Sequence, residues 1–241
     1  MIYISIIYIK ELVIIKDILS INKMMKKGII LLKNSLALMG QEILESTILV
    51  ICINAILSRI GVLELSIYTL LSSVVSIVLM PMYSYASTAL TLVSKNYGKK
   101  QFEKMFIIPK FSLKLAMIYC ISIAIILIIS KEYIVMLITN DYNLISYSLQ
   151  YFIIALCSCL FNIPNNIYKY SLQGIGDDKW VLLNAAIINI VGIGLILFLS
   201  TILKMGIYGV YIGMALNYII LSFSNSYRFN HRIALYSEKS I

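Results

Sequence analysis

The stretch that decides the fold runs from Leu36 to Ser58 and reads LALMGQEILESTILVICINAILS. A helix rises about 1.5 Å per residue, so a stretch of this length crosses a hydrocarbon layer about 30 Å thick. It nevertheless carries Gln41, Glu42 and Glu45. A charged side chain at the centre of a bilayer costs roughly 2.5 to 3.5 kcal/mol and usually faces a protein interior or a water-filled path. We therefore expect a transmembrane helix whose acidic side chains have a function.

Composition places the whole chain in the same class. Of its 241 residues, 61% are hydrophobic and only 13% are charged, and the mean hydropathy is +0.92. Soluble domains are closer to one half apolar, so these values predict an all-α integral membrane protein. The four cysteines fall within apolar runs, which indicates no disulfide framework. The net charge of +9 comes from lysines between apolar runs, so we expect a lipid bilayer and no nucleic acid as partner.

Five further apolar stretches follow the first one. They lie at about residues 65–93, 111–130, 144–168, 181–203 and 207–226. Together with the opening stretch they predict a bundle of six transmembrane helices over residues 35–228. Pro81 lies near the middle of the second helix and should kink it.

The remaining segments suggest three smaller parts of the chain. Residues 1–15 are predicted to form a partial apolar helix, too short to span a membrane. Residues 16–34 place lysines between apolar residues at helical spacing, which is typical of a basic amphipathic linker on an anionic membrane face. Residues 229–241 are expected to be a polar cytoplasmic tail.

The positive charges are distributed unequally between the two ends of such a bundle. With six spans, only three of the twenty Lys and Arg residues fall on one face, namely Arg59, Lys131 and Lys204. The other seventeen fall on the opposite face. The positive-inside rule assigns the richer face to the cytoplasm. We expect a multi-pass protein of the cytoplasmic membrane.

The two glutamates of the opening stretch are the main candidates for chemistry. Glu42 and Glu45 are three residues apart and share a helix face. Counting from Leu36 places Glu45 about 13 Å into the layer, near the midplane where secondary transporters bind ions and substrates. A low dielectric favours its neutral form, so it is a candidate proton acceptor, or it stays ionised opposite Na⁺ or a cationic substrate. A purely structural carboxyl, bonded to a neighbouring helix, remains the alternative.

The other polar residues of the apolar runs point to packing. Intramembrane amides either line a polar cavity or form interhelical hydrogen bonds; they are Asn162, Asn165, Asn166, Asn184, Asn189 and Asn217. Gly209 and Gly213 match the small-xxx-small pattern of helix packing. Cys157 and Cys159 point to different helix faces, so no metal site is predicted. No constellation of nucleophile, metal or cofactor ligands is present, and neither an enzyme nor a resident cofactor is expected.

Several landmarks in order resemble the second half of the multidrug and toxic compound extrusion (MATE) family of secondary antiporters. They are QEILES in the first helix; a long second helix that ends near Gly98; the connection MLITNDYN; the turn SLQGIGDDKW; and the glycine pattern GIYGVYIG at residues 206–213. The resemblance implies one lobe, the C-terminal one, of a fold in which two six-helix lobes face each other across a cleft. Residues 1–15 would then be the remnant of the preceding lobe.

The resemblance also assigns roles to residues. Glu45 falls on the position of the family's acidic residue in the first helix of this lobe, with Glu42 and Gln41 beside it. Two departures matter: Ala37 lies near the place of the family's helix-opening proline, and Asn162 stands where some members carry an Asp. The second departure leaves Glu45 to act alone or with Glu42.

These patterns lead to one functional hypothesis and two alternatives. The hypothesis is an antiporter coupled to H⁺ or Na⁺ that exports drugs or other small organic cations, with a missing N-terminal lobe or a partner chain completing it. One alternative is a flippase of lipid-linked saccharides, whose cleft should carry several basic residues, whereas the late spans here contain only Lys169. The other alternative is a truncated membrane fragment that transports nothing.

Overall fold

The structure, a computed structural model, describes residue 36 and residues 39–238. The chain divides into two compact units, residues 1–40 and residues 41–241, and all that follows concerns the second. The partial helix expected at residues 1–15 and the linker expected at residues 16–34 lie outside the described residues. Within the described part, the chain forms helices and short connections and contains no strand.

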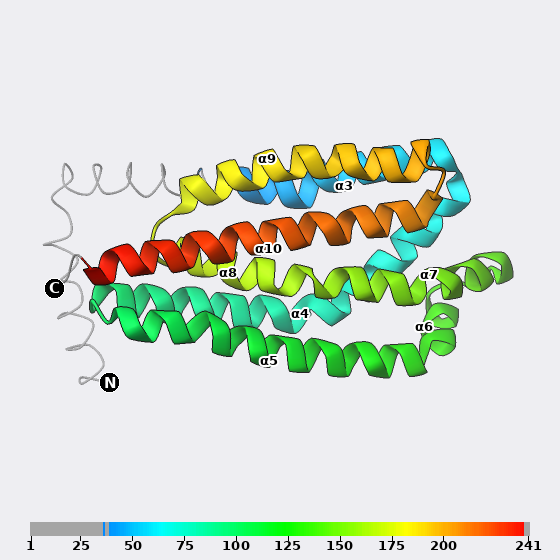
Figure 1. Ribbon diagram of the computed structural model, residues 1–241. Helices are drawn as coiled ribbons and strands as arrows, with labels where there is room; N and C mark the ends of the chain where they lie inside the picture. Colours follow the sequence, from blue (N-terminus) through cyan, green and yellow to red (C-terminus); the bar gives the residue numbers. More distant parts are fainter. Residues whose placement is uncertain (1–35, 37–38, 239–241) are drawn as a thin grey trace, which may run out of the picture. The chain divides into compact units, whose positions relative to one another are not determined.

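Six helical segments are long and apolar enough to cross a membrane (Figure 1). They are Met39–Ile60, Val62–Gly98, Phe102–Ile129, Tyr142–Gly174, Asp178–Ile202 and Gly206–Tyr236. The prediction of an all-α bundle of six membrane-spanning helices is therefore confirmed.

Several spans consist of more than one element. The elements are the π-helices η1 (Ile43–Ile48) and η2 (Phe198–Ile202) and the α-helices α3 (Leu49–Ile60), α4 (Val62–Gly98), α5 (Phe102–Ile129), α6 (Lys131–Ile138), α7 (Tyr142–Leu160), α8 (Asn162–Gly174), α9 (Asp178–Leu197) and α10 (Gly206–Glu238). The fourth span breaks at Phe161, directly before α8. Pro164 lies in the first turn of α8, where a missing backbone N–H costs no helical hydrogen bond.

The last helix is longer than its hydropathy suggests. The polar tail expected from residue 229 onward is helical as far as Glu238. The reason is packing: Phe229 and Ile233 are fully buried, and the Tyr236 ring meets the Tyr97 ring edge-on with centroids 5.3 Å apart. Spaced four and three residues apart, these side chains form an apolar stripe that a span-length hydropathy average does not detect.

The long helices of this unit run side by side (Figure 1). Helix α4 packs against α5 and α8, α10 packs against α8 and α9, and α3 packs against α4 and α9. Pro81 lies inside α4, and Figure 1 shows that this helix bends along its length. The outward faces expose large apolar side chains at helical spacing, for example Ile118, Ile125 and Ile129 on α5. Such faces suit contact with lipid tails.

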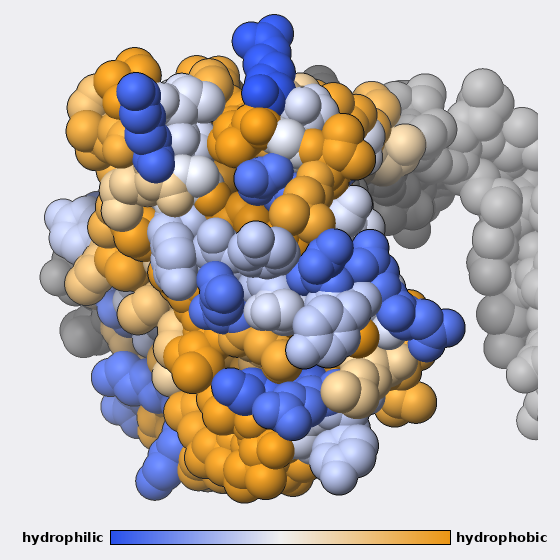
Figure 2. Space-filling model, turned by 90° about the vertical axis from the view of Figure 1, so that its right-hand side faces the viewer, coloured by the Kyte–Doolittle hydropathy of each residue, from blue (hydrophilic) through white to orange (hydrophobic). Residues whose placement is uncertain are grey.

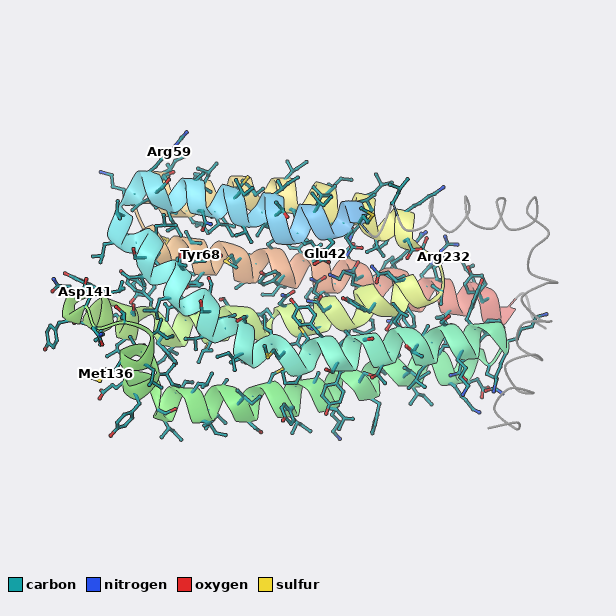
Figure 3. The ribbon with its side chains drawn as sticks, turned by 180° about the vertical axis from the view of Figure 1, so that it is seen from behind. Glu42, Arg59, Tyr68, Met136, Asp141 and Arg232 are labelled. Atoms are coloured by element: carbon teal, nitrogen blue, oxygen red, sulfur yellow. The ribbon has the colours of Figure 1, made fainter. Side chains whose placement is uncertain are left out.

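The two ends of the bundle differ in charge. The α4–α5 and α8–α9 connections and the end of α10 share one end, which we call the basic end (Figure 1). The opposite end carries Arg59 in the last turn of α3, Lys131 at the start of α6, and Lys204 between η2 and α10. Figure 2 views this end face-on, with polar side chains grouped among apolar ones. Figure 3 labels Arg59 and Arg232 at opposite ends. The described lysines and arginines of the α4–α5 connection, of the α8–α9 connection and of the end of α10 therefore lie at the basic end, whereas Lys169, which the sequence count also assigns to that end, is buried in α8.

Candidate functional site

An ion pair between distant segments forms the centre of the site. Lys169 of α8 donates from Nζ to Glu45 Oε2 across 2.6 Å. The lysine side chain is 5% exposed and the glutamate side chain 22% exposed. The pair joins the first span to the fourth, so Glu45 is held by a residue of another helix.

A second polar contact lies one helical turn away on both segments. The Gln41 amide Nε2 donates to Glu45 Oε1 across 3.3 Å, and Gln41 Oε1 accepts a hydrogen bond of 2.9 Å from Gln173 Nε2. Gln41 precedes Glu45 by four residues, and Lys169 precedes Gln173 by four. The two segments are therefore joined by a short ladder in which both carboxylate oxygens of Glu45 have partners.

Glu45 occupies an unusual backbone position. It lies in the π-helix η1, which continues directly into α3. Such wide turns are rare and occur frequently at functional sites. The π-helical turn and the ladder together hold the glutamate between the first span and α8.

The ion pair borders a polar cavity of about 310 Å³. Its polar walls come from five spans: Glu42, Glu45, Tyr83, Asn162, Asn165, Asn166, Lys169, Tyr170, Asn189 and Tyr218. The structure thus brings Glu42, Glu45 and Asn162 to one cavity, while Gln41 is not part of its lining and donates a hydrogen bond to Glu45. Figure 3 shows Glu42 along the length of the bundle, between the ends marked by Arg59 and Arg232.

The amides of the late spans bond to one another between helices. Asn225 of α10 donates to Asn165 Oδ1 across 2.9 Å and accepts from Asn184 Nδ2 of α9 across 3.2 Å. In α8, the amides of Asn165 and Asn166 both donate to Asn162 Oδ1, at 3.1 and 2.8 Å. The asparagines therefore serve both of the uses that the sequence leaves open, because they crosslink helices and also line the cavity.

A second cavity, of about 190 Å³, adjoins the first and is lined by aromatic groups. It shares Leu79, Tyr83 and Tyr218 with the polar cavity. Tyr68 and Tyr211 complete its ring lining, with centroids 6.0 Å apart, and the buried Tyr211 hydroxyl has no hydrogen-bond partner. We call this space the tyrosine chamber. Sequence reasoning missed it, because the tyrosines are scattered over two helices and 150 residues.

A cluster of charges holds the α8–α9 turn at the basic end. Asp177 accepts hydrogen bonds from Arg228 Nε at 2.9 Å and from Arg232 Nε at 3.1 Å and Nη2 at 3.2 Å. Burial opposes ionisation of this carboxyl, but the two arginines outweigh it and the pKa of Asp177 lies below its usual range. The turn within SLQGIGDDKW is thus a structural anchor between α8, α9 and α10.

Sequence reasoning also missed the partner of Glu45. A lysine in an apolar span is itself a sign of an intramembrane counter-charge, and that signal was present at Lys169. Among the described residues, no group of three or more His, Cys, Asp or Glu side chains is placed to hold a metal ion. The site offers one carboxylate–ammonium pair, a second carboxylate at Glu42, and amide and phenol groups.

Comparison with known proteins places this arrangement in a family. The sequence pattern of the MatE family matches residues 37–202. No curated protein matches the chain significantly. Among solved structures, an outward-facing multidrug resistance MATE family transporter of the MOP superfamily superposes with a TM-score of 0.75 at 14% identity, covering 85% of this chain and 45% of that one.

Two further structures agree. A MATE in complex with MaL6 gives a TM-score of 0.73 at 14% identity and the same coverages, 85% and 45%. A MOP superfamily transporter from Pyrococcus furiosus gives 0.72 at 17% identity, covering 81% of this chain and 43% of that one. The chain therefore spans less than half the length of each solved protein. Because the family pattern covers more than half of the chain and the six-helix fold agrees with it, the chain belongs to the MatE family of membrane transporters.

Proposed function

We propose that the chain is the C-terminal lobe of a cation-coupled antiporter that exports small organic cations, with H⁺ or Na⁺ as the coupling ion. The observation that carries the proposal is the Glu45–Lys169 ion pair, which lies in a polar cavity between two membrane-spanning segments. Buried charges within spans usually mark ion or substrate paths. Membership in a transporter family supports the same conclusion.

The charges and rings of the cavity suit an organic cation. The described lining of the cavity contains two carboxylates, Glu42 and Glu45, and one ammonium, Lys169. The adjoining tyrosine chamber supplies aromatic faces, which attract cations and stack with rings. A flippase of lipid-linked saccharides would need several cations for its phosphates, and the one lysine here is already paired. An organic cation is therefore the substrate class that the site favours.

The ion pair also supplies a contact that cargo binding would change. A cation that binds Glu45 competes with the Lys169 ammonium for the same carboxylate oxygen. Binding therefore weakens a link between the first span and α8, and a helix contact that responds to cargo is what alternating access requires. Gln41 and Gln173 remain as a neutral link between the same segments.

The complete transporter in this proposal contains a second, N-terminal lobe, in the same chain or as a partner chain. The solved transporters that resemble this chain are more than twice as long as the part it covers. The lobe would lie in the cytoplasmic membrane with the basic end facing the cytoplasm, as the distribution of lysine and arginine favours.

The test is efflux of a fluorescent organic cation such as ethidium from cells. The chain is expressed alone and together with an N-terminal MATE lobe on a second plasmid. Replacing Glu45 with Gln should abolish gradient-driven efflux, because the carboxylate no longer binds a cation. The matched control is Glu103→Gln, an exposed carboxylate in the first turn of α5. Equal efflux by Glu45→Gln and Glu103→Gln, at equal amounts in the membrane, contradicts the proposal.

A further inference from the structure

The Lys169 ammonium occupies the place that a bound cation would take. It lies 2.6 Å from Glu45 Oε2, and the other carboxylate oxygen accepts from Gln41. Its side chain is almost fully buried, and the Tyr170 ring centroid lies 5.5 Å from Nζ. The carboxylate therefore already has its positive partner, supplied by the protein itself.

The surroundings of this position provide the ligands that a hard cation prefers. Carboxylate and amide carbonyl oxygens are the usual ligands of such ions. Glu45 offers the first kind, and Asn162, Asn165 and Asn166 border the same cavity with the second. The Lys169 ammonium is the positively charged group next to these oxygen ligands.

We propose that Lys169 determines cation selectivity: its tethered ammonium keeps sodium from binding at Glu45. Two unit positive charges about 4 Å apart in a medium of effective dielectric 20 repel strongly enough to weaken binding about a thousandfold. A sodium ion would either bind against this repulsion or displace the ammonium from Glu45, its ion-pair partner. This inference rests on the proposed antiport, and of the two coupling ions considered it leaves the proton.

Other titratable side chains share the cavity with Lys169. The titratable side chains that line the cavity with it come from the first span, α4, α8 and α10: Glu42, Glu45, Tyr83, Tyr170 and Tyr218. The carboxylates are the acidic groups among them, so a change at Lys169 alters the net charge of the cavity directly. A neutral residue at position 169 removes the ammonium from Glu45 Oε2 and leaves this oxygen accessible to another cation.

The experiment measures binding of radioactive ²²Na⁺ to the purified full chain in detergent, by scintillation proximity. The natural chain should show no saturable binding. Lys169→Met should bind sodium saturably, at least a hundredfold more tightly than the natural chain. Lys169→Arg keeps the charge and should not bind, and the double variant Glu45→Gln with Lys169→Met removes the carboxylate and should lose the gained binding.

Two results would overturn the inference. One is sodium binding by the natural chain within tenfold of the Lys169→Met value. The other is a folded Lys169→Met chain, monodisperse by size exclusion, that binds no sodium. If that variant does not fold, Lys169→Gln, which keeps a polar group, takes its place.

Binding and transport can be separated in this design. The binding assay needs no transport activity. If the chain gives no efflux even together with an N-terminal lobe, the proposed antiport is refuted, and the selectivity of Lys169 is still judged by ²²Na⁺ binding. In cells with active efflux, replacing external sodium by potassium should leave the rate unchanged. A rate that falls several-fold without sodium would refute the selectivity inference while the proposed antiport stands.

Discussion

The contact between α10 and η2 makes a quantitative prediction about two glycines. A Cβ atom added at Gly209 would lie 2.7 Å from the backbone C of Leu199 and the backbone N of Ser200. Ordinary contacts between such atoms are about 3.5 to 4.0 Å, so the two backbones would have to separate by about 1 Å. Because the atoms belong to the backbone, no side-chain rotation relieves the clash. At Gly194 in α9, an added Cβ meets nothing within 4 Å.

These two positions should respond to alanine with opposite signs. Overpacking costs about 1 to 3 kcal/mol, while alanine gains up to about 1 kcal/mol over glycine inside a helix. Gly209→Ala should therefore lower the free energy of unfolding by about 1 to 2 kcal/mol, and Gly194→Ala should raise it by about 0.5 to 1 kcal/mol. Gly213→Ala should fall between them, because its nearest neighbour, at 2.6 Å, is the Ile196 side-chain atom Cγ1.

The assay is thermal unfolding of the purified variants in one detergent, followed by circular dichroism and by intrinsic fluorescence. A difference of about 1.5 to 3 kcal/mol corresponds to a separation of roughly 3 to 12 °C in Tm for a chain of this size. Equal melting temperatures for Gly209→Ala and Gly194→Ala would refute the close backbone approach at Gly209. They would also remove the physical basis for reading GVYIG as a packing motif.

Two more predictions concern polar anchors. Asp177→Asn should lower Tm by several degrees at neutral pH, while the exposed Glu103→Gln should not. The pKa of Asp177 is lower in the native state than its unfolded value of about 3.9. The stabilisation by Asp177 is therefore fully present above that unfolded pKa and is lost as the pH falls through the native pKa. The Tm difference between the natural chain and Asp177→Asn should shrink below about pH 4. Asn225→Ala should cost about 1 to 3 kcal/mol in the same assay, because it removes one hydrogen-bond partner from the buried Asn165 amide on α8 and one from the half-buried Asn184 amide on α9. Ser224→Ala removes one hydroxyl bond and should cost less. An Asn225→Ala chain as stable as the natural one would contradict the amide crosslink.

The fold was predictable from the sequence because membrane spans depend on local composition. The length of an apolar run predicts a span without knowledge of its neighbours, and all six were found that way. The helical end of α10 was not, because Phe229, Ile233 and Tyr236 are stabilised by contacts with α4 and α5 that a hydropathy average does not include.

Of the candidate site, only the residues of the first helix could be predicted from the sequence. The depth of Glu45 in its span, its neighbour Glu42 and the family position all follow from local sequence. Its partner does not, because Lys169 lies 124 residues away and pairing depends on how the first span packs against α8. The tyrosine chamber could not be predicted for the same reason, since Tyr68 and Tyr211 come into contact only when α4 and α10 are packed.

The ion pair changes the energetics of the proposed exchange. A lone buried glutamate needs a coupling ion to neutralise it in every state. Here Lys169 neutralises Glu45, and breaking such a pair without replacement costs about 3 to 5 kcal/mol. That cost is avoided when an organic cation binds Glu45 as the ammonium withdraws, and again when the ammonium returns as the cargo leaves. In the proposed antiport, cargo and lysine then alternate on one carboxylate, so charge balance links the movement between the first span and α8 to cargo occupancy.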